Sequence, residues 1–447
     1  MLRKWLRCHL YCPRKGGLAL LNDRKGNQSS IWLIVCLVSF LFLTSCEPQA
    51  ALPSVNGNAS QVVKLRIWLW PGSGLERLVK KYMADHPGVD VEIVSFQFDD
   101  VLPGLMTSLA TKADTPDLVL LEASQLNQVK RFQNEFFNLY DYGDERVHYL
   151  DWKWRQAESK DGGFLFAMPV DIGPVALAYR RDLFQMAGLP VEREEVADSL
   201  TNWEQLEQAG LEIKKKTGAY LIDNLANVFM SYLNQFDGHY LTPMDHELDP
   251  HVKEAWDQAI RFHKLGLNAG LPSQSSAWAS AAVNGKFAVV LAPSWLHGAF
   301  KKVAPSTAGV WDLARAPGLP SNWSGTCLAV PRTSRNPHAA YELAQWLTAP
   351  AQQLDSFIGS GNFPPTPESY STREFLEVRD AFFHDAPVGQ IYSYTALRYK
   401  AAYNDFEYEG IERMIKEGLR RVESEGADPE HTWEDIIRRF KQINTGG

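Results

Sequence analysis

The sequence lacks the motifs that mark several large classes of enzyme. It has no GxSxG nucleophile elbow, no HExxH zinc motif, no GxGxxG fingerprint and no phosphate-binding loop. Internal repeats, charge blocks and low-complexity tracts are also missing. The motifs therefore predict no catalytic residue, no metal and no cofactor, so any function has to come from other features.

Cysteine and positive charge are scarce after the first 45 residues. Only Cys46 and Cys327 of the five cysteines lie there. Setting aside the seven basic residues and the one acidic residue before Cys46 leaves 38 Lys and Arg against 52 Asp and Glu, a net charge of −14. This acidic balance argues against a nucleic-acid partner, because phosphate binding requires the opposite sign.

No run of apolar residues is long enough to span a membrane, but a shorter one is present. Residues 31–43 form an apolar run of 13 residues, which fits the roughly 7–15 residues of a signal-peptide core and falls short of the ~20 needed to cross a bilayer. Basic residues precede the run, and Leu43-Thr44-Ser45-Cys46 comes directly after it and resembles a bacterial lipobox. The alternative is an uncleaved anchor helix with an incidental cysteine. We predict a signal peptide over residues 1–45 and a diacylglycerol on the thiol of Cys46.

The chain after the leader is large enough for two domains. Residues 46–61 are predicted to be a flexible tether, because residues 53–61 are rich in small and polar side chains. About 400 residues remain once the leader is removed, too many for one compact core. If Cys46 carries lipid, no intramolecular disulfide is available, so stability has to come from buried apolar area.

Strand and helix patterns alternate at the start of this body. Strands are predicted over residues 62–70, 89–94 and 116–121, with helical patterns between them. This alternation implies parallel strands and α/β layers, in which ligands bind beyond the carboxyl ends of the strands. The residues expected at that edge are Trp70, Gly72, Glu122 and Ser124.

The rest of the chain continues with mixed elements. Prolines at 169 and 174 bracket an extended crossing that leads into a strand over residues 175–179. Thr201 is predicted to cap a helix that runs to Lys216, with Trp203 in the core. Residues 327–330 form a buried strand, residues 337–347 form an amphipathic helix, and the C-terminal third is strongly helical.

Four motifs in order resemble the sugar-binding, maltose-binding-like group of bacterial extracellular solute-binding proteins. They are the crossing segment 166–190 (beginning FAMPVDIGP), the strand 284–295 (NGKFAVVLAPSW), the run 311–318 (WDLARAPG) and the element 324–337 (beginning SGTCLAVP). The chain departs from the family pattern at residues 323–325, where the family has a glycine-rich triplet. It departs again at residues 180–182, where Arg-Arg-Asp replaces Asn-Lys-Asp, and we expect this second change to affect only the surface.

The resemblance implies a two-lobed α/β fold of the type II periplasmic-binding-protein kind, with a hinge that the chain crosses three times. Lobe one would comprise residues 62–167 and 327–358, and lobe two residues 171–322 and 363–447. The family implies that a mono- or oligosaccharide binds between the lobes and is delivered to the permease subunits of an ABC importer. We expect a monomer, lipid-anchored on the outer face of the cytoplasmic membrane or on the periplasmic side if the host has two membranes.

Aromatic and carboxylate side chains are the residues expected to hold a sugar. Flat aromatic rings pack on the apolar C–H faces of a sugar, and carboxylates or amides bind its hydroxyls. Trp295 ends a strand where the family places its cleft aromatic, and Asp171 lies on the crossing segment. The full set of expected ligand-binding residues is Trp70, Gly72, Glu122, Ser124, Asp171, Trp295, Trp323, Gly325 and Phe363.

Three alternatives remain beside sugar capture. Glu122 and Asp171 could be the paired carboxylates of a glycoside hydrolase, although no hydrolase motif surrounds either. The same fold could bind a non-sugar solute such as a polyamine, iron or a small anion. The chain could also serve in adhesion without any small ligand.

Overall fold

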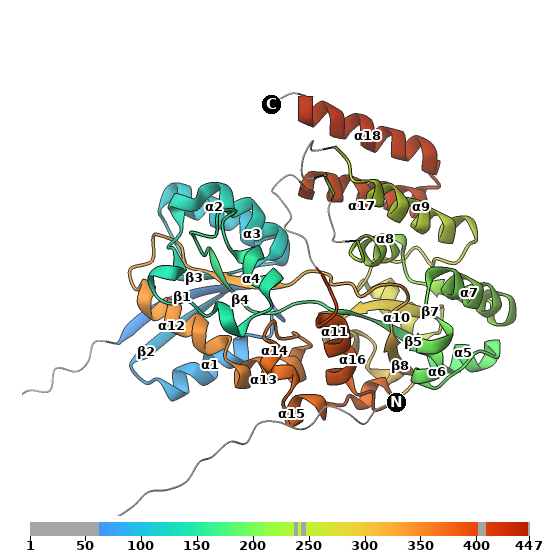
Figure 1. The fold of residues 1–447 in the computed structure, drawn as a ribbon, viewed down its shortest axis with the longest axis horizontal. Helices are drawn as coiled ribbons and strands as arrows, with labels where there is room; N and C mark the ends of the chain where they lie inside the picture. Colours follow the sequence, from blue (N-terminus) through green and yellow to red (C-terminus); the bar gives the residue numbers. More distant parts are fainter. Residues whose placement is uncertain (1–61, 237–239, 243–246, 401–407, 446–447) are drawn as a thin grey trace, which may run out of the picture. The chain divides into compact units, whose positions relative to one another are not determined.

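A computed structural model describes residues 62–236, 240–242, 247–400 and 408–445. The predicted signal peptide, tether and Cys46 lie outside the described residues. Contacts divide the chain into Met1–Ala59 and Ser60–Gly447, so everything described below belongs to the second unit. This unit is built on two β-sheets (Figure 1).

The first sheet has the strand order β2-β1-β3-β9-β4. Its strands are β1 (Val63–Leu69), β2 (Val89–Ser95), β3 (Leu118–Glu122), β4 (Ala167–Pro169) and β9 (Thr326–Ala329). Strand β1 runs parallel to β2 and β3, whereas β9 is antiparallel to both β3 and β4. The parallel pairing that the sequence predicts therefore holds for the first three strands, and a strand from late in the chain completes the sheet in the opposite direction.

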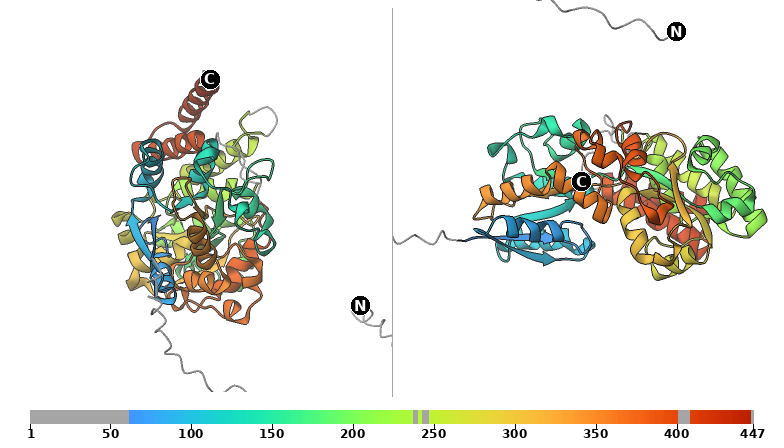
Figure 2. Two further views of the ribbon diagram at one scale, coloured as in Figure 1. Left: turned by 90° about the vertical axis from the view of Figure 1, so that its left-hand side faces the viewer. Right: turned by 90° about the horizontal axis from the view of Figure 1, so that it is seen from below.

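Helices from both ends of the sequence cover this sheet. They are α1 (Glu76–Asp85), α2 (Val101–Thr111), α3 (Ala123–Val129), α4 (Asp151–Ala157) and α12 (Pro337–Leu347). Helix α12 contacts α1 and β1, and the right-hand view of Figure 2 shows its orange ribbon beside the blue N-terminal elements. One apolar core joins these elements, and it includes Ile67 of β1, Leu121 of β3 and Leu328 of β9, all three fully buried.

The second sheet has the order β6-β7-β5-β8. Its strands are β5 (Val175–Arg180), β6 (Tyr220–Ile222), β7 (Phe287–Pro293) and β8 (Trp311–Arg315). Strand β5 is antiparallel to both β7 and β8, while β6 is parallel to β7. Strands β5 and β7 are buried along their whole length, because helices cover both faces of the sheet.

The helices of this second half come from a long stretch of sequence. They are α5 (Arg181–Ala187), α6 (Arg193–Ser199), α7 (Trp203–Thr217), α8 (Leu225–Leu233), α9 (Pro250–Lys264), α10 (Ser276–Val283), α11 (Ser294–Val303), α13 (Pro350–Ser360), α14 (Pro367–Tyr370), α15 (Arg373–Leu376), α16 (Val388–Ala396), α17 (Tyr408–Glu425) and α18 (Pro429–Thr445). Helix α17 packs against both α18 and α8 (Figure 1).

Main-chain hydrogen bonds tie together the segments that cross between the two sheets. The Ile172 amide donates to the Phe363 carbonyl at 2.9 Å, and the Trp323 amide donates to the Gly173 carbonyl at 2.7 Å. The predicted two-lobed α/β fold is confirmed, while the residue bounds assigned to each lobe stay a prediction.

Two local expectations were wrong, and the first concerns a helix cap. The residue that caps α7 is Asn202 rather than Thr201, because the Asn202 side chain accepts from the Gln205 amide at 2.9 Å. Thr201 instead donates its hydroxyl to the Gln205 side chain. Trp203 is buried in the core, as predicted.

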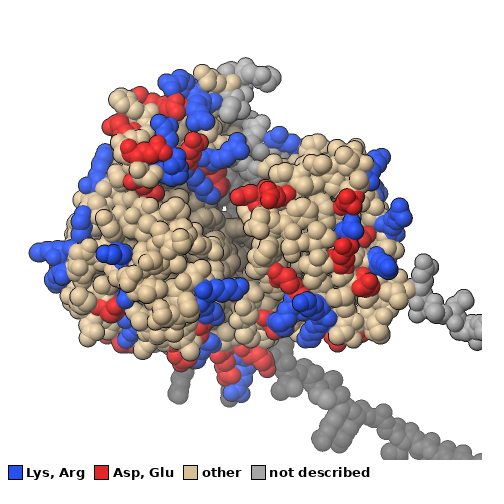
Figure 3. Space-filling model, turned by 180° about the vertical axis from the view of Figure 1, so that it is seen from behind, with Lys and Arg blue, Asp and Glu red and all other residues tan. Residues whose placement is uncertain are grey.

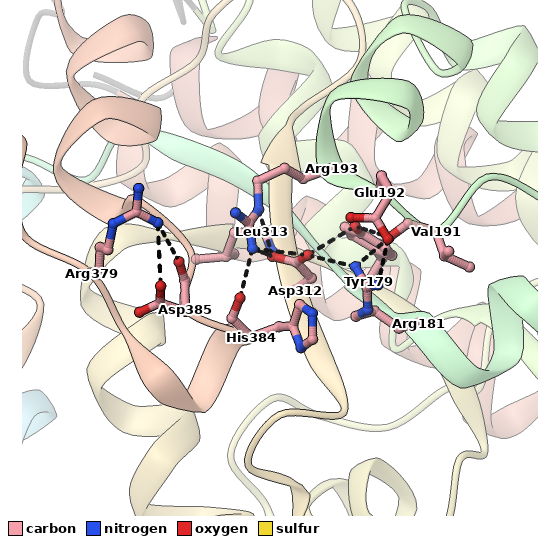
Figure 4. A network of polar contacts seen from close by, with 10 residues as sticks. All are labelled: Tyr179, Arg181, Val191, Glu192, Arg193, Asp312, Leu313, Arg379, His384 and Asp385. Atoms are coloured by element: carbon pink, nitrogen blue, oxygen red, sulfur yellow. Dashed lines mark hydrogen bonds and ion pairs between the residues drawn. The ribbon is translucent and has the colours of Figure 1, made fainter.

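The second wrong expectation concerns the arginines at 180 and 181, which are not confined to the surface. Arg180 is buried and donates to the Ala282 carbonyl at 2.7 Å. Arg181 donates to Asp312 at 3.1 Å, and that fully buried carboxylate also accepts from Tyr179 and Arg193 (Figure 4). The expectation of a surface change was wrong because the guanidinium donors find buried acceptors that are distant in sequence.

Candidate functional site

A cavity of about 680 Å³ lies where the two halves of the body meet. Residues after β1 and β3 line one side, and residues of α8, α11 and α17 line the other. The structure brings together eight of the nine expected ligand-binding residues here: Trp70, Gly72, Glu122, Ser124, Asp171, Trp295, Trp323 and Gly325. Whether they contact a ligand stays a prediction.

Two tryptophans form an aromatic corner of the cavity. The rings of Trp295 and Trp323 lie 5.8 Å apart at 76°, an edge-to-face arrangement. The Trp295 indole N–H donates to the Trp323 carbonyl at 3.1 Å, so the ring of Trp295 is held in one orientation. Gly173 makes this contact possible, because a Cβ at that position would overlap the Trp323 carbonyl oxygen.

Glu122 ends β3 and caps α3. Its carboxylate accepts from the Ser124 amide at 2.7 Å, and the Glu122 amide donates back to the Gln125 side chain at 3.1 Å, which completes a capping box. The Ser324 hydroxyl donates to the other carboxylate oxygen at 2.8 Å. These bonds hold a negatively charged acceptor at the cavity edge in a fixed position.

Asp171 lies on the first crossing segment and is buried. Its Oδ1 accepts from the Thr326 amide at 2.6 Å and from the Thr326 hydroxyl at 2.8 Å. Burial raises the pKa of Asp171, while the Thr326 hydroxyl and the nearby Lys153 ammonium act in the opposite direction. Both hydrogen bonds fall on one oxygen of this carboxylate.

Phe363 does not line the cavity. The ring is fully buried and packs among Phe357, Tyr370, Phe375 and Tyr392. The expectation that it walls the cleft is corrected: the hinge bond between Ile172 and the Phe363 backbone is present, but the side chain belongs to the core.

Several lining residues were not identified from the sequence. The ring of Trp152 meets Tyr399 edge-on at 5.1 Å, and the Lys416 ammonium lies 5.7 Å from the Trp323 ring and pairs with Glu412. Other missed lining residues include Phe98, Gln156, Met230, Asn234, Tyr240, Gln274, Lys302, Asn322 and Asn362. The tryptophan at 152 could have been suspected from its residue type, but no sequence signal tells which face of α17 meets the cavity.

Charge is mixed both in the cavity and on the surface. The cavity lining contains Glu122, Asp171 and Glu412 together with Lys302 and Lys416. Figure 3 shows basic and acidic side chains interspersed over one face of the molecule. Among the residues that the structure describes, no group of three or more His, Cys, Asp or Glu could hold a metal ion. None of the described helices has the length and apolar character needed to cross a bilayer.

Comparison with known proteins identifies the family. Residues 77–381 match the model of the bacterial extracellular solute-binding protein family. The chain belongs to this family. A crystal structure described as an extracellular solute-binding protein of family 1 is 31% identical, with a TM-score of 0.77, and the match covers 85% of this chain and 99% of that one.

Two curated proteins and one further structure are also similar. A lactose-binding protein of Rhizobium radiobacter is 28% identical over 57% of this chain and 62% of its own length. An arabinooligosaccharide-binding protein of Halalkalibacterium halodurans is 20% identical over 57% of this chain and 59% of its own length. The matches thus span about six-tenths of these relatives. A binding protein from B. animalis subsp. lactis in complex with β-1,6-galactobiose shares the fold at a TM-score of 0.71, with 18% identity over 86% of this chain and 98% of that one.

Proposed function

We propose that this solute-binding protein captures a neutral mono- or oligosaccharide in the cavity and delivers it, chemically unchanged, to an ABC-type importer. The observation that carries the proposal is the combination of the Trp295–Trp323 corner with the carboxylates of Glu122 and Asp171 in one cavity. Aromatic faces suit the C–H faces of a sugar ring, and carboxylates accept hydrogen bonds from its hydroxyls. The names of the curated relatives, which refer to lactose and to arabinooligosaccharides, support this ligand class.

Capture would proceed by closure of the two halves around the ligand. The lining residues Trp70 and Glu122 come from the first half, and Trp295 and Lys416 come from the second. A ligand that contacts both sets only in a closed arrangement shifts the equilibrium toward that arrangement. Because the transporter would receive the sugar from the closed form, the protein needs to bind its ligand but not to transform it.

We further propose that the protein is exported as a monomer and held at the membrane by lipid on Cys46. The lipobox Leu43-Thr44-Ser45-Cys46 and the polar residues 46–61 support this part of the proposal. A tethered body stays close to its transporter, which raises its effective concentration there. Metabolic labelling with a fatty acid would mark the wild-type protein, and Cys46→Ser would abolish the label. Equal labelling of both would contradict lipidation at this cysteine.

A thermal-shift screen tests the ligand class. The body from residue 62 onward is heated with lactose, maltose, arabinooligosaccharides and β-1,6-galactobiose, and with spermidine as a non-sugar cation. A sugar present at 100 times its Kd should stabilise the folded state by about 2.7 kcal/mol and raise the melting temperature. A shift with spermidine alone would contradict sugar capture and favour a polyamine ligand.

The same mixtures distinguish capture from hydrolysis. Reducing ends are measured after overnight incubation with each oligosaccharide. We expect no release above the buffer control. Release that disappears in Glu122→Gln would contradict simple capture and assign the site to a glycoside hydrolase.

A further inference from the structure

Lys153 is a charged residue buried beneath the cavity. It lies on α4, and its relative exposure is 0%. Removing an ammonium from water is costly unless its charge and donors are compensated, so a lysine at such a position calls for a reason. Lys153 does not itself line the cavity, but its neighbours Gln156 and Asp171 do.

The contact with Gln156 fixes which end of that amide faces outward. Lys153 Nζ lies 2.9 Å from Gln156 Oε1. An ammonium can donate hydrogen bonds but cannot accept them, so the amide oxygen is the end that meets Lys153. The NH₂ group of Gln156 is therefore the end left for the cavity, where it offers two donors.

The second neighbour is Asp171. A Cβ on Gly325 would lie 2.8 Å from Lys153 Nζ and 2.6 Å from the Asp171 carbonyl oxygen, so the two residues meet at this glycine. The positive charge of Lys153 favours the ionised form of the buried Asp171 carboxylate, against the effect of burial. The other charged or titratable groups around this pair are Glu122, which acts on Asp171, Cys327, whose thiol is a hydrogen-bond partner of Lys153, and Lys130, which acts on Cys327.

We propose that Lys153 is a positioning residue that sets the hydrogen-bonding polarity of the cavity floor: it holds the Gln156 oxygen so that the NH₂ is left for the ligand, and it places a positive charge beside the acceptor Asp171. This inference rests on the proposed function, because a sugar hydroxyl both donates and accepts. The floor would offer it a donor from Gln156 and an acceptor from Asp171. A residue outside the cavity thus selects ligands that have hydroxyl groups.

The first experiment uses the ligand-free protein. Aspartate is labelled with ¹³C at the side-chain carboxyl, Asp171→Asn assigns the signal, and the titration midpoint of Asp171 is followed by NMR. Lys153→Gln keeps a donor for Gln156 but removes the charge, and Lys153→Met removes both. We expect both variants to move the midpoint to higher pH, because the compensating cation is gone.

Two control variants make the result specific. Arg155→Met removes a cation from the exposed face of the same helix and should leave the midpoint unchanged. Lys153→Arg keeps the charge and should restore the wild-type midpoint. An unchanged midpoint in folded Lys153→Gln would overturn the proposal, and it would do so whether or not any sugar binds.

The second experiment measures sugar binding by calorimetry between pH 5 and pH 8. The probe is lactose, or the sugar with the largest shift in the screen if lactose gives none. Lys153→Met should weaken binding about tenfold and move the acidic limb of the Kd profile to higher pH. Lys153→Gln should move the acidic limb in the same direction but weaken binding less. A merely structural role would change the melting temperature and leave the pH profile in place. A panel in which no sugar binds the wild type counts against the proposed function, while the titration of Asp171 still decides the role of Lys153.

Discussion

A half-buried glutamate on α17 gives a quantitative prediction. Glu423 on α17 accepts from the Leu225 amide, the first residue of α8, at 2.5 Å and from the Asn268 side chain at 3.2 Å. Burial raises the pKa of Glu423 to about 7, and the negative charge of Asp223 acts in the same direction. The informative substitution is Glu423→Gln, which keeps an oxygen for both donors but cannot ionise.

The sign and size of the effect come from the shift in pKa. The ordinary pKa of the group is 4.5, so its proton is bound more tightly in the folded state. The resulting stabilisation is complete below pH 4.5 and is lost as the pH rises through about 7. Between pH 5 and pH 8 the loss integrates to about 2.5 kcal/mol of unfolding free energy for this group. Glu423→Gln has no such loss, so it should match the wild type near pH 5 and exceed its stability at pH 8.

The assay is urea unfolding followed by tryptophan fluorescence at several pH values. The quantity of interest is the difference in unfolding free energy between variant and wild type, because other titrating groups then largely cancel. Glu417→Gln, on an exposed position of the same helix, is the matched control and should show a difference independent of pH. If the difference for Glu423→Gln is equally flat from pH 5 to pH 8, the explanation given for the raised pKa of Glu423 is wrong.

Three further substitutions test the site and the packing. Trp295→Ala should weaken sugar binding in calorimetry by about tenfold or more, which is on the order of 1.5 kcal/mol. Trp346→Ala, outside the cavity, should leave the Kd unchanged. Equal effects of the two substitutions would argue against a stacking role for Trp295. Gly173→Ala should lower the unfolding free energy by about 2 kcal/mol, because the added Cβ overlaps the Trp323 carbonyl oxygen. The control is Gly88→Ala, whose Cβ meets no atom within 4 Å. Similar stabilities of the two variants would refute the overlap. Asp312→Asn should cost about 3 kcal/mol in urea unfolding, because it removes the buried negative charge that pairs with Arg181 and Arg193. A change below about 1 kcal/mol would contradict this account of the network.

Local patterns were enough to predict many of the elements. The helix predicted over residues 337–347 coincides with α12, because proline starts it and its apolar residues repeat with helical spacing. The strand patterns near Ile67, Leu120 and Leu328 likewise match β1, β3 and β9. Eight cleft residues could be predicted because they come after strand ends or lie in motifs of the family.

Apart from the cap of α7, where Asn202 replaces Thr201, the failures depend on contacts between distant parts of the chain. Phe363 and Trp295 are both aromatic residues beside crossing segments, yet only the contacts of the folded chain put one in the core and the other at the cavity. Arg180 is buried because it reaches carbonyls about a hundred residues away, at Ala282 and Val283. Lys416 could not be predicted as a lining residue, because helical periodicity does not tell where α17 packs.

The hydrogen bonds between the crossing segments also limit which substitutions the cavity can accept during evolution. Asp171, Trp323 and Gly325 line the cavity and also belong to the segments that join the two sheets. Any rotation about those segments displaces the groups offered to the ligand, and any substitution that reshapes the site alters the joint. Under the proposed function, selection for a new ligand would therefore act on the hinge as well as on the site, so that ligand specificity and the motion of the two halves would evolve together.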